Sequence, residues 1–154
     1  MKIKIRYKLP PTVARVERNT RPAVNEGLRD RTVRSLDNYR FCSASNQSAR
    51  IRQLNSEWDT ERVLETNAAA LLLCGSLLGW KRGRNWFLFT GLVGGSLLLH
   101  ALQGWSPAVP LIRKLGVRTS EEINREKSAL KLLRGDFALN NYSVYGALAA
   151  AEKQ

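Results

Sequence analysis

The stretch Trp86–Trp105, WFLFTGLVGGSLLLHALQGW, decides the fold of this chain. It contains no Asp, Glu, Lys or Arg, and nine of its residues between Phe87 and Leu102 are Leu, Phe or Val. Nineteen residue steps of α-helix cover ~28 Å, close to the ~30 Å hydrocarbon thickness of a bilayer. On a membrane-insertion scale the nine apolar residues contribute roughly −3 to −5 kcal/mol. The stretch therefore predicts a membrane-spanning helix.

A weaker apolar segment, Glu65–Trp80 (ETNAAALLLCGSLLGW), precedes it across the basic turn Lys81–Asn85. Its five central leucines contribute roughly −1.5 to −3 kcal/mol, opposed by Asn67, Ser76 and two glycines. Inserted together with its stronger neighbour, this segment is predicted to be the first arm of a transmembrane helical hairpin. The alternative is a soluble helical hairpin buried in a partner, because the apolar runs are at or below the spanning limit.

Tryptophans and glycines mark the ends and the packing faces of this hairpin. Tryptophan prefers the membrane–water interface. We therefore assign four tryptophans to that interface: Trp58, Trp80, Trp86 and Trp105. Each segment also carries one G-x-x-x-G motif, which allows two helix backbones to approach closely. Helix packing, within the hairpin or between copies, is predicted at Gly75, Gly79, Gly91 and Gly95.

The flanks of the hairpin are basic and polar. The 154-residue chain carries 25 Lys and Arg against 13 Asp and Glu, a net charge of +12. Seven basic residues lie near the outer ends of the hairpin and three in its turn. The positive-inside rule then places both termini in the cytoplasm. A start that alternates between basic and apolar residues is not a secretory signal, which agrees with a cytoplasmic N-terminal region.

Residues 1–62 form a basic cytoplasmic N-terminal region, with 14 basic and seven acidic side chains. One helix is predicted to begin at Pro22, and a second near Ala49 that continues into the hairpin. In an extended chain the opening stretch places four basic side chains on one side: Lys2, Lys4, Arg6 and Lys8. This basic strip is either a frayed tail, a strand added to a partner's sheet, or a contact with anionic lipid or an acidic protein face.

The transmembrane hairpin covers residues 63–105, and residues 106–154 are predicted to form an interfacial helix and a C-terminal tail. Thr119 and Glu122 have the spacing of a capping box, and Gly135 is a natural helix stop. Between them an apolar stripe is flanked by basic side chains, as in helices that lie at a membrane surface. An ordinary helix docked on a partner fits the same pattern.

Residues with catalytic chemistry are sparse. The chain has one His and two Cys, so neither a Ser-His-Asp triad nor a multi-histidine metal site can be built within it. No glycine-rich phosphate loop occurs. The carboxylates stand beside Lys or Arg and are interpreted as surface ion pairs. We therefore predict no enzymatic activity, no catalytic residue and no metal site.

His100 is the candidate cofactor ligand, because an ionisable residue within a spanning segment is a functional hypothesis by default. The simpler interpretation is a hydrogen bond to a neighbouring carbonyl or to headgroups. The alternative is a tetrapyrrole, heme or chlorophyll, bound through His100, since Ser96 one turn earlier leaves room for a planar ring. If His100 does not bind a tetrapyrrole, no cofactor is expected.

Over about residues 57–137 the chain resembles the YgaP-like transmembrane domain family, which comprises small hairpins of the bacterial inner membrane. The resemblance rests on the Gly-rich second segment, the exit Gly104-Trp105-x-Pro107, and Leu115-Gly116 followed by Thr119. Relatives carry Cys where this chain has Ser106. Some also carry a rhodanese sulfurtransferase domain, which 62 residues around Cys42 cannot hold. The resemblance implies a membrane anchor of the bacterial inner membrane without an enzyme half.

The sequence therefore predicts an all-α membrane protein, a two-helix transmembrane hairpin with basic N-terminal helices and an interfacial C-terminal helix. The expected function is that of a non-enzymatic accessory or scaffolding subunit of a bacterial membrane complex. Its expected partners are the lipid membrane, a membrane-protein complex or its own copies, and anionic lipid or an acidic protein face. Nucleic acid is not expected, because no helix shows a one-sided row of basic residues. The alternative functions are tetrapyrrole binding through His100 and an oligomeric pore.

Overall fold

The structure, a computed structural model, describes residues 10–136, and every regular element in that range is helical. This confirms the predicted all-α class. The basic strip of Lys2, Lys4, Arg6 and Lys8 lies outside the described residues. After a 3-10 turn at Thr12–Ala14 the helices are α1 Arg15–Arg18, α2 Pro22–Arg40, α3 Ala44–Ser56, α4 Thr60–Arg82, α5 Asn85–Gln103, α6 Val109–Lys114 and α7 Ser120–Arg134.

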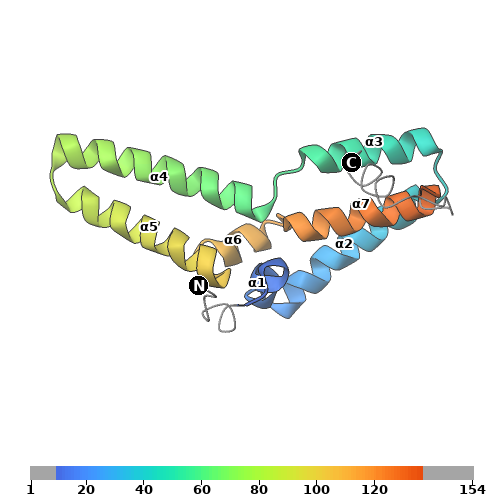
Figure 1. Ribbon diagram of the computed structural model, residues 1–154, viewed down its shortest axis with the longest axis horizontal. Coiled ribbons are helices and arrows are strands. Elements are labelled where there is room, and N and C mark those ends of the chain that lie inside the picture. Colours follow the sequence, from blue (N-terminus) through green and yellow to red (C-terminus); the bar gives the residue numbers. More distant parts are fainter. Residues whose placement is uncertain (1–9, 137–154) are drawn as a thin grey trace, which may run out of the picture.

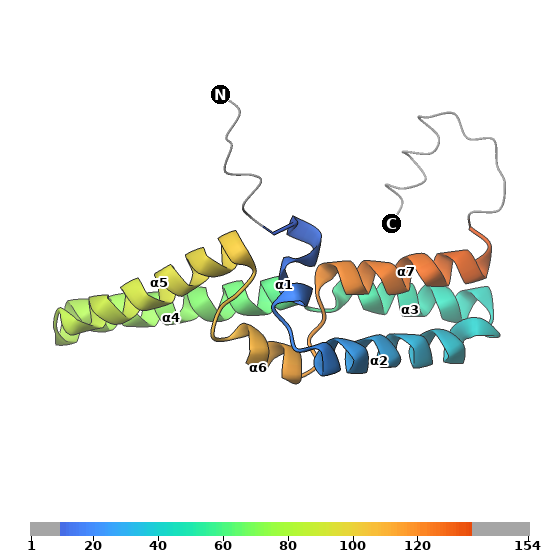
Figure 2. The same cartoon turned by 90° about the horizontal axis from the view of Figure 1, so that it is seen from below.

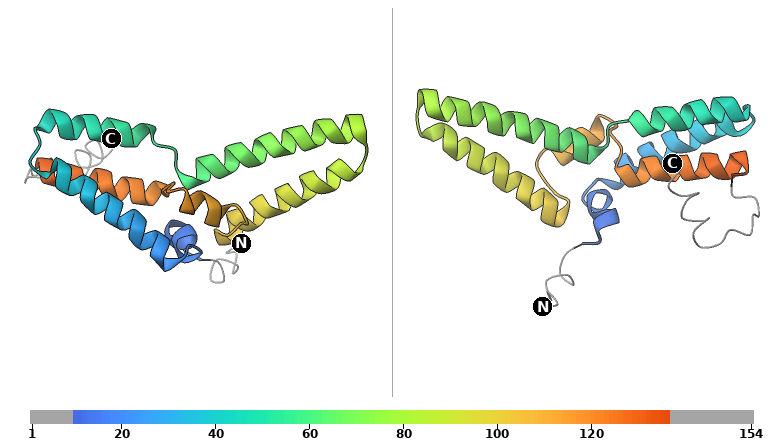
Figure 3. Two further views of the ribbon diagram at one scale, coloured as in Figure 1. Left: turned by 180° about the vertical axis from the view of Figure 1, so that it is seen from behind. Right: turned by 45° about the horizontal axis from the view of Figure 1, so that its top comes forward.

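The helices form two groups at opposite ends of an elongated molecule (Figure 1). At one end α4 and α5 lie side by side, and we call this pair the hairpin. At the other end α2, α3 and α7 pack together, and we call this group the body. The short helices α1 and α6 lie between them and form the junction (Figures 2 and 3).

The hairpin has a tighter turn than the sequence suggests. Helix α4 continues to Arg82, so the connection to α5 consists of Gly83 and Arg84 alone. At the other end α5 stops at Gln103, two residues before the predicted end. The cause is Gly104, which has a left-handed φ of +74° and donates its N–H to the His100 carbonyl at 2.7 Å. Only glycine adopts this conformation without strain.

The second helix does not continue into the apolar region, and the predicted continuity is wrong. Helix α3 ends at Ser56 and α4 begins at Thr60. Asp59 caps α4 by accepting the Arg62 N–H at 2.8 Å. Thr60 is itself buried and donates its N–H to the Arg118 carbonyl at 2.8 Å. The start of the hairpin is thereby attached to the link between α6 and α7, and the chain bends at this point.

The body buries its own apolar core. Helices α3 and α7 contribute Ile51, Leu54, Ile123 and Leu130, against which Leu36 and Tyr39 of α2 pack. The capping box and the Gly135 stop of α7 lie where the sequence predicts them. The predicted interfacial role of this helix needs correction, however. Ile123 and Leu130 of its apolar stripe are buried against α2 and α3 of the same chain, whereas Leu133 is 44% exposed, so most of the stripe packs within the body.

Candidate functional site

The hairpin exposes a large apolar surface along both of its helices. Two helical stretches of the described residues, one ending at Arg82 and the other Asn85–Gln103, are long and apolar enough to cross a membrane. Soluble monomers rarely expose contiguous apolar patches of more than a few hundred Å². The exposed large apolar side chains of the hairpin are Leu71, Leu73, Leu77, Trp80, Trp86, Phe87, Leu88, Phe89, Leu92, Leu98, Leu99 and Leu102.

Only one of the two G-x-x-x-G motifs lies in the contact between α4 and α5. A Cβ atom on Gly75 would be 2.6 Å from Thr90 Cγ2, and one on Gly79 would be 2.9 Å from the Phe87 ring. Both glycines are buried, and their small size permits this approach. Cβ atoms on Gly91 and Gly95 would meet nothing within 4 Å. The second motif therefore faces away from α4.

The four tryptophans occupy the two ends of the hairpin. Trp80 and Trp86 flank the tip, where the Trp86 ring also meets Phe89 edge-on at 6.1 Å. Trp58 precedes α4 and Trp105 follows α5, so both lie toward the junction. All four are exposed. The tryptophans therefore form two exposed aromatic levels, one at each end of the hairpin helices.

The junction fastens the end of α5 to α1. Arg15 donates from Nη1 to the Ala101 carbonyl at 2.7 Å and from Nη2 to the Glu61 carboxylate at 2.7 Å. Asn19 donates to the Gln103 carbonyl at 2.8 Å. A cation at a helix C-terminus also interacts favourably with the helix dipole. Three helices, α1, α4 and α5, are thus held at one point.

His100 lies on the same end of α5 and is 4% exposed. Within residues 10–136 neither ring nitrogen has a hydrogen-bond partner, and the same is true of the buried Ser106 hydroxyl. The structure therefore gives the imidazole no carbonyl partner within the described residues. Both ring nitrogens are thus enclosed by protein in this conformation.

A buried ion-pair network connects the junction to the body. The first part centres on Arg113, whose side chain is fully buried. Its guanidinium donates twice to Glu122, at 2.6 and 2.7 Å, and once to the Asn25 side chain at 2.9 Å. It also reaches the Thr20 hydroxyl at 3.3 Å. This arginine therefore ties α6 to α7 and to the start of α2.

The second part of the network centres on Glu126, whose carboxylate is completely buried. It accepts hydrogen bonds from Ser35 at 2.6 Å, from Arg50 at 3.0 Å, and from Arg118. Arg118 also forms a bidentate pair with Glu57 at 2.7 and 2.9 Å. Together these bonds join α2, α3 and α7.

Hydrogen bonding keeps the buried carboxylates ionised. Burial by itself would raise the pKa of Glu126, but the hydrogen bonds from Ser35 and Arg118 outweigh it and lower this pKa below its ordinary value. The pKa of Glu122 is lowered in the same way, mainly by Arg113. The prediction that the carboxylates form surface pairs is therefore wrong for these two residues. The missed signal is the spacing of Ile123, Glu126 and Leu130, which puts a charge inside the apolar stripe.

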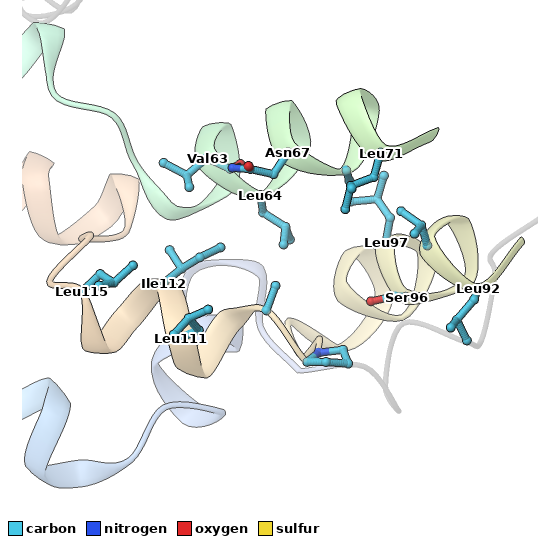
Figure 4. Close-up of a pocket in the computed structure, with 14 residues that line it drawn as sticks. Val63, Leu64, Asn67, Leu71, Leu92, Ser96, Leu97, Leu111, Ile112 and Leu115 are labelled. Carbon is cyan, nitrogen blue, oxygen red and sulfur yellow. The ribbon is translucent and has the colours of Figure 1, made fainter. Parts of the chain in front are cut away.

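An apolar cavity of about 480 Å³ lies between α4, α5 and α6. Figure 4 shows Leu64 and Ile112 pointing into the space between α4 and α6, with Ser96 and Leu97 reaching in from α5. His100 does not line this cavity. Its lining residues are Val63, Leu64, Asn67, Ala68, Leu71, Leu92, Val93, Ser96, Leu97, Pro107, Ala108, Leu111, Ile112 and Leu115.

The described part of the chain contains no cluster of three His, Cys, Asp or Glu side chains that could hold a metal ion. Comparison with protein-family models, with curated proteins and with solved structures gives no match for this chain. The candidate site is therefore defined by its own geometry. It comprises an exposed apolar hairpin, a cavity at the base of that hairpin, and a polar network beneath it.

Proposed function

We propose that this chain is a non-enzymatic scaffolding subunit of a bacterial membrane complex, with its hairpin in the inner membrane and its body on the cytoplasmic face. The contrast between the two ends of the molecule carries the proposal. The body buries its apolar residues and pairs its buried charges, whereas the hairpin leaves its leucines and aromatic rings exposed. Removing the exposed apolar side chains of the hairpin from water stabilises the protein by about 25 cal/mol per Å². A lipid bilayer can cover both helices of the hairpin at once.

The packing of the body supports an arrangement with both termini on one side of the membrane. Helix α7, which follows the hairpin, packs on α2 and α3, which precede it. A spanning hairpin therefore returns the chain to the side from which it entered. The positive-inside rule counts Lys and Arg and gives little weight to Asp and Glu, so the ion pairs do not reduce the cytoplasmic count. The seven flanking basic residues are Arg50, Arg52, Arg62, Arg113, Lys114, Arg118 and Arg125.

A scaffolding role fits a body that exposes basic side chains toward a partner. Arg29, Arg34 and Arg40 of α2 are exposed, and within the described residues they form no ion pair. An acidic protein face or anionic lipid is the complementary surface. The resemblance to the YgaP-like hairpins points to the same kind of anchor.

Two measurements test this proposal. The chain in native membranes should stay in the pellet after an alkaline carbonate wash. High pH releases proteins that are held at the membrane surface by charge, but it does not extract a hairpin inserted in the bilayer. Solubilised in mild detergent, it should migrate in a native gel as an assembly larger than the purified chain alone. Release by carbonate would contradict the membrane anchor, and migration at the size of the purified chain would contradict the scaffolding role.

The two alternative functions have separate tests. Tetrapyrrole binding through His100 predicts a visible absorption band in gently purified protein that His100→Ala abolishes. An oligomeric pore predicts ion flux from vesicles that contain the chain. The buried position of His100 favours the scaffold over the tetrapyrrole, because both ring nitrogens are enclosed by protein in this conformation.

A further inference from the structure

A second cavity with a different chemistry adjoins the apolar cavity of Figure 4. It has a volume of about 370 Å³ and lies between α6 and the segment that joins α1 to α2. Pro107 and Leu111 line both cavities, so the two share a wall formed by the start of α6. The lining residues of the second cavity are Asn19, Thr20, Arg21, Val24, Pro107, Pro110, Leu111 and Lys114.

The second cavity offers positive charge to a ligand. Arg21 and Lys114 are exposed and form no ion pair with any residue of the described range. No carboxylate lines this cavity. The other polar groups already have internal partners, since Asn19 donates to Gln103 and Thr20 bonds the Val16 carbonyl. An Arg and a Lys side chain that line one cavity without a carboxylate suit a phosphate group.

The first cavity offers a hydrocarbon environment. Only Asn67 and Ser96 among its lining residues are polar. The Asn67 amide already donates to the Val63 carbonyl at 2.7 Å, which leaves little polarity for a ligand to meet. Its volume lies within the range of roughly 300–1,000 Å³ typical of small-molecule sites. Leu111 and Leu115 are exposed at its edge, so an apolar chain can enter from the surface beside the hairpin.

We propose that the base of the hairpin binds one anionic phospholipid. The phosphate lies between Arg21 and Lys114, and an acyl chain enters the cavity between α4, α5 and α6. This inference rests on the proposed function, which puts the junction at the level of the cytoplasmic headgroups. The exposed Trp58 and Trp105 at the same end of the hairpin agree with that level. The ligand holds α6, rather than α7, at the membrane surface.

The test titrates the purified full chain, stripped of lipid in mild detergent, with phosphatidylglycerol or phosphatidylcholine and counts bound lipids by native mass spectrometry. One phosphatidylglycerol should bind in preference to phosphatidylcholine. The double variant Arg21→Gln/Lys114→Gln should lose about 25-fold in phosphatidylglycerol affinity, roughly fivefold for each basic side chain. The matched control Arg52→Gln/Arg82→Gln removes two exposed arginines outside both cavities and should leave the affinity unchanged.

A second variant tests the acyl-chain cavity separately. Ala108→Phe adds a ring at the wall of the apolar cavity and should weaken both lipids while leaving their ratio unchanged. Inorganic phosphate should not displace the bound lipid, because it has no chain to bury. Equal affinity for the two lipids, an equal loss in the control variant, or displacement by inorganic phosphate would overturn the inference. If the chain nevertheless resists carbonate, the proposed anchor stands; release by carbonate removes both.

Discussion

Replacing Glu126 with Leu should destabilise the body by about 3–5 kcal/mol, because it leaves buried charge without its partner. The side chain is completely buried, and its carboxylate accepts hydrogen bonds from Ser35, Arg50 and Arg118. Leucine has a similar size but accepts none of them. Arg118, itself 3% exposed, then keeps only Glu57 as an ionic partner. A urea titration in mild detergent, followed by far-ultraviolet circular dichroism, measures this loss.

Two companion variants decide what the loss means. Glu121→Leu removes a surface pair with the half-exposed Arg125 and should cost no more than about 1 kcal/mol. The double variant Glu126→Leu/Arg118→Met should be more stable than Glu126→Leu alone, because it removes the stranded charge together with its partner. A cost for Glu126→Leu as small as that of the surface variant would refute the buried network.

Three further predictions concern the hairpin, the pH dependence and the junction. Gly75→Leu should destabilise the hairpin by about 1–3 kcal/mol through overpacking, whereas Gly91→Leu should not; thermal unfolding in detergent compares them, and equal melting would contradict the assigned contact. The buried carboxyl groups of α7 have pKa values below their ordinary value of 4.5, so they stabilise the body above about pH 4.5 and lose this effect as the pH falls through the lowered pKa values. An acid titration of the body should therefore show a loss of stability as the pH falls below about 4.5, and Glu126→Gln should reduce this dependence. Arg15→Ala should free the Ala101 carbonyl and speed amide exchange at the end of α5, and unchanged exchange would contradict its role in the junction.

The local signals in the sequence located most helices well. Pro22 begins α2, the Thr119 capping box begins α7 and Gly135 ends it, since each of these features acts within one turn of the chain. The uncharged stretch from Trp86 likewise identified α5. By contrast, the break between α3 and α4 depends on the Thr60 backbone bonding to Arg118, 58 residues away. Such a contact leaves no local pattern, and the one local sign of the break is Asp59, an N-cap residue at the start of α4.

The candidate site was predictable only in part for the same reason. G-x-x-x-G spacing identified both glycine pairs, but which pair meets the other helix depends on how α4 and α5 rotate against each other. The cavity at the base of the hairpin is formed by three helices and needs α6, a six-residue helix that the sequence does not signal. The ion-pair network joins side chains from Thr20 to Glu126, and its local sign is the position of Glu126 within the apolar stripe.

The most direct test of the central claim is the sidedness of the hairpin tip relative to the body. Asn85→Cys places a thiol at the tip without removing a basic residue of the turn, and Cys74→Ser leaves the native Cys42 as the reporter of the body. A membrane-impermeant maleimide applied to intact bacterial spheroplasts should label the introduced thiol at the tip, and should label Cys42 only after the membrane is opened. Labelling of Cys42 in intact spheroplasts, or equal labelling of both thiols there, would contradict a hairpin that spans the membrane with its body inside.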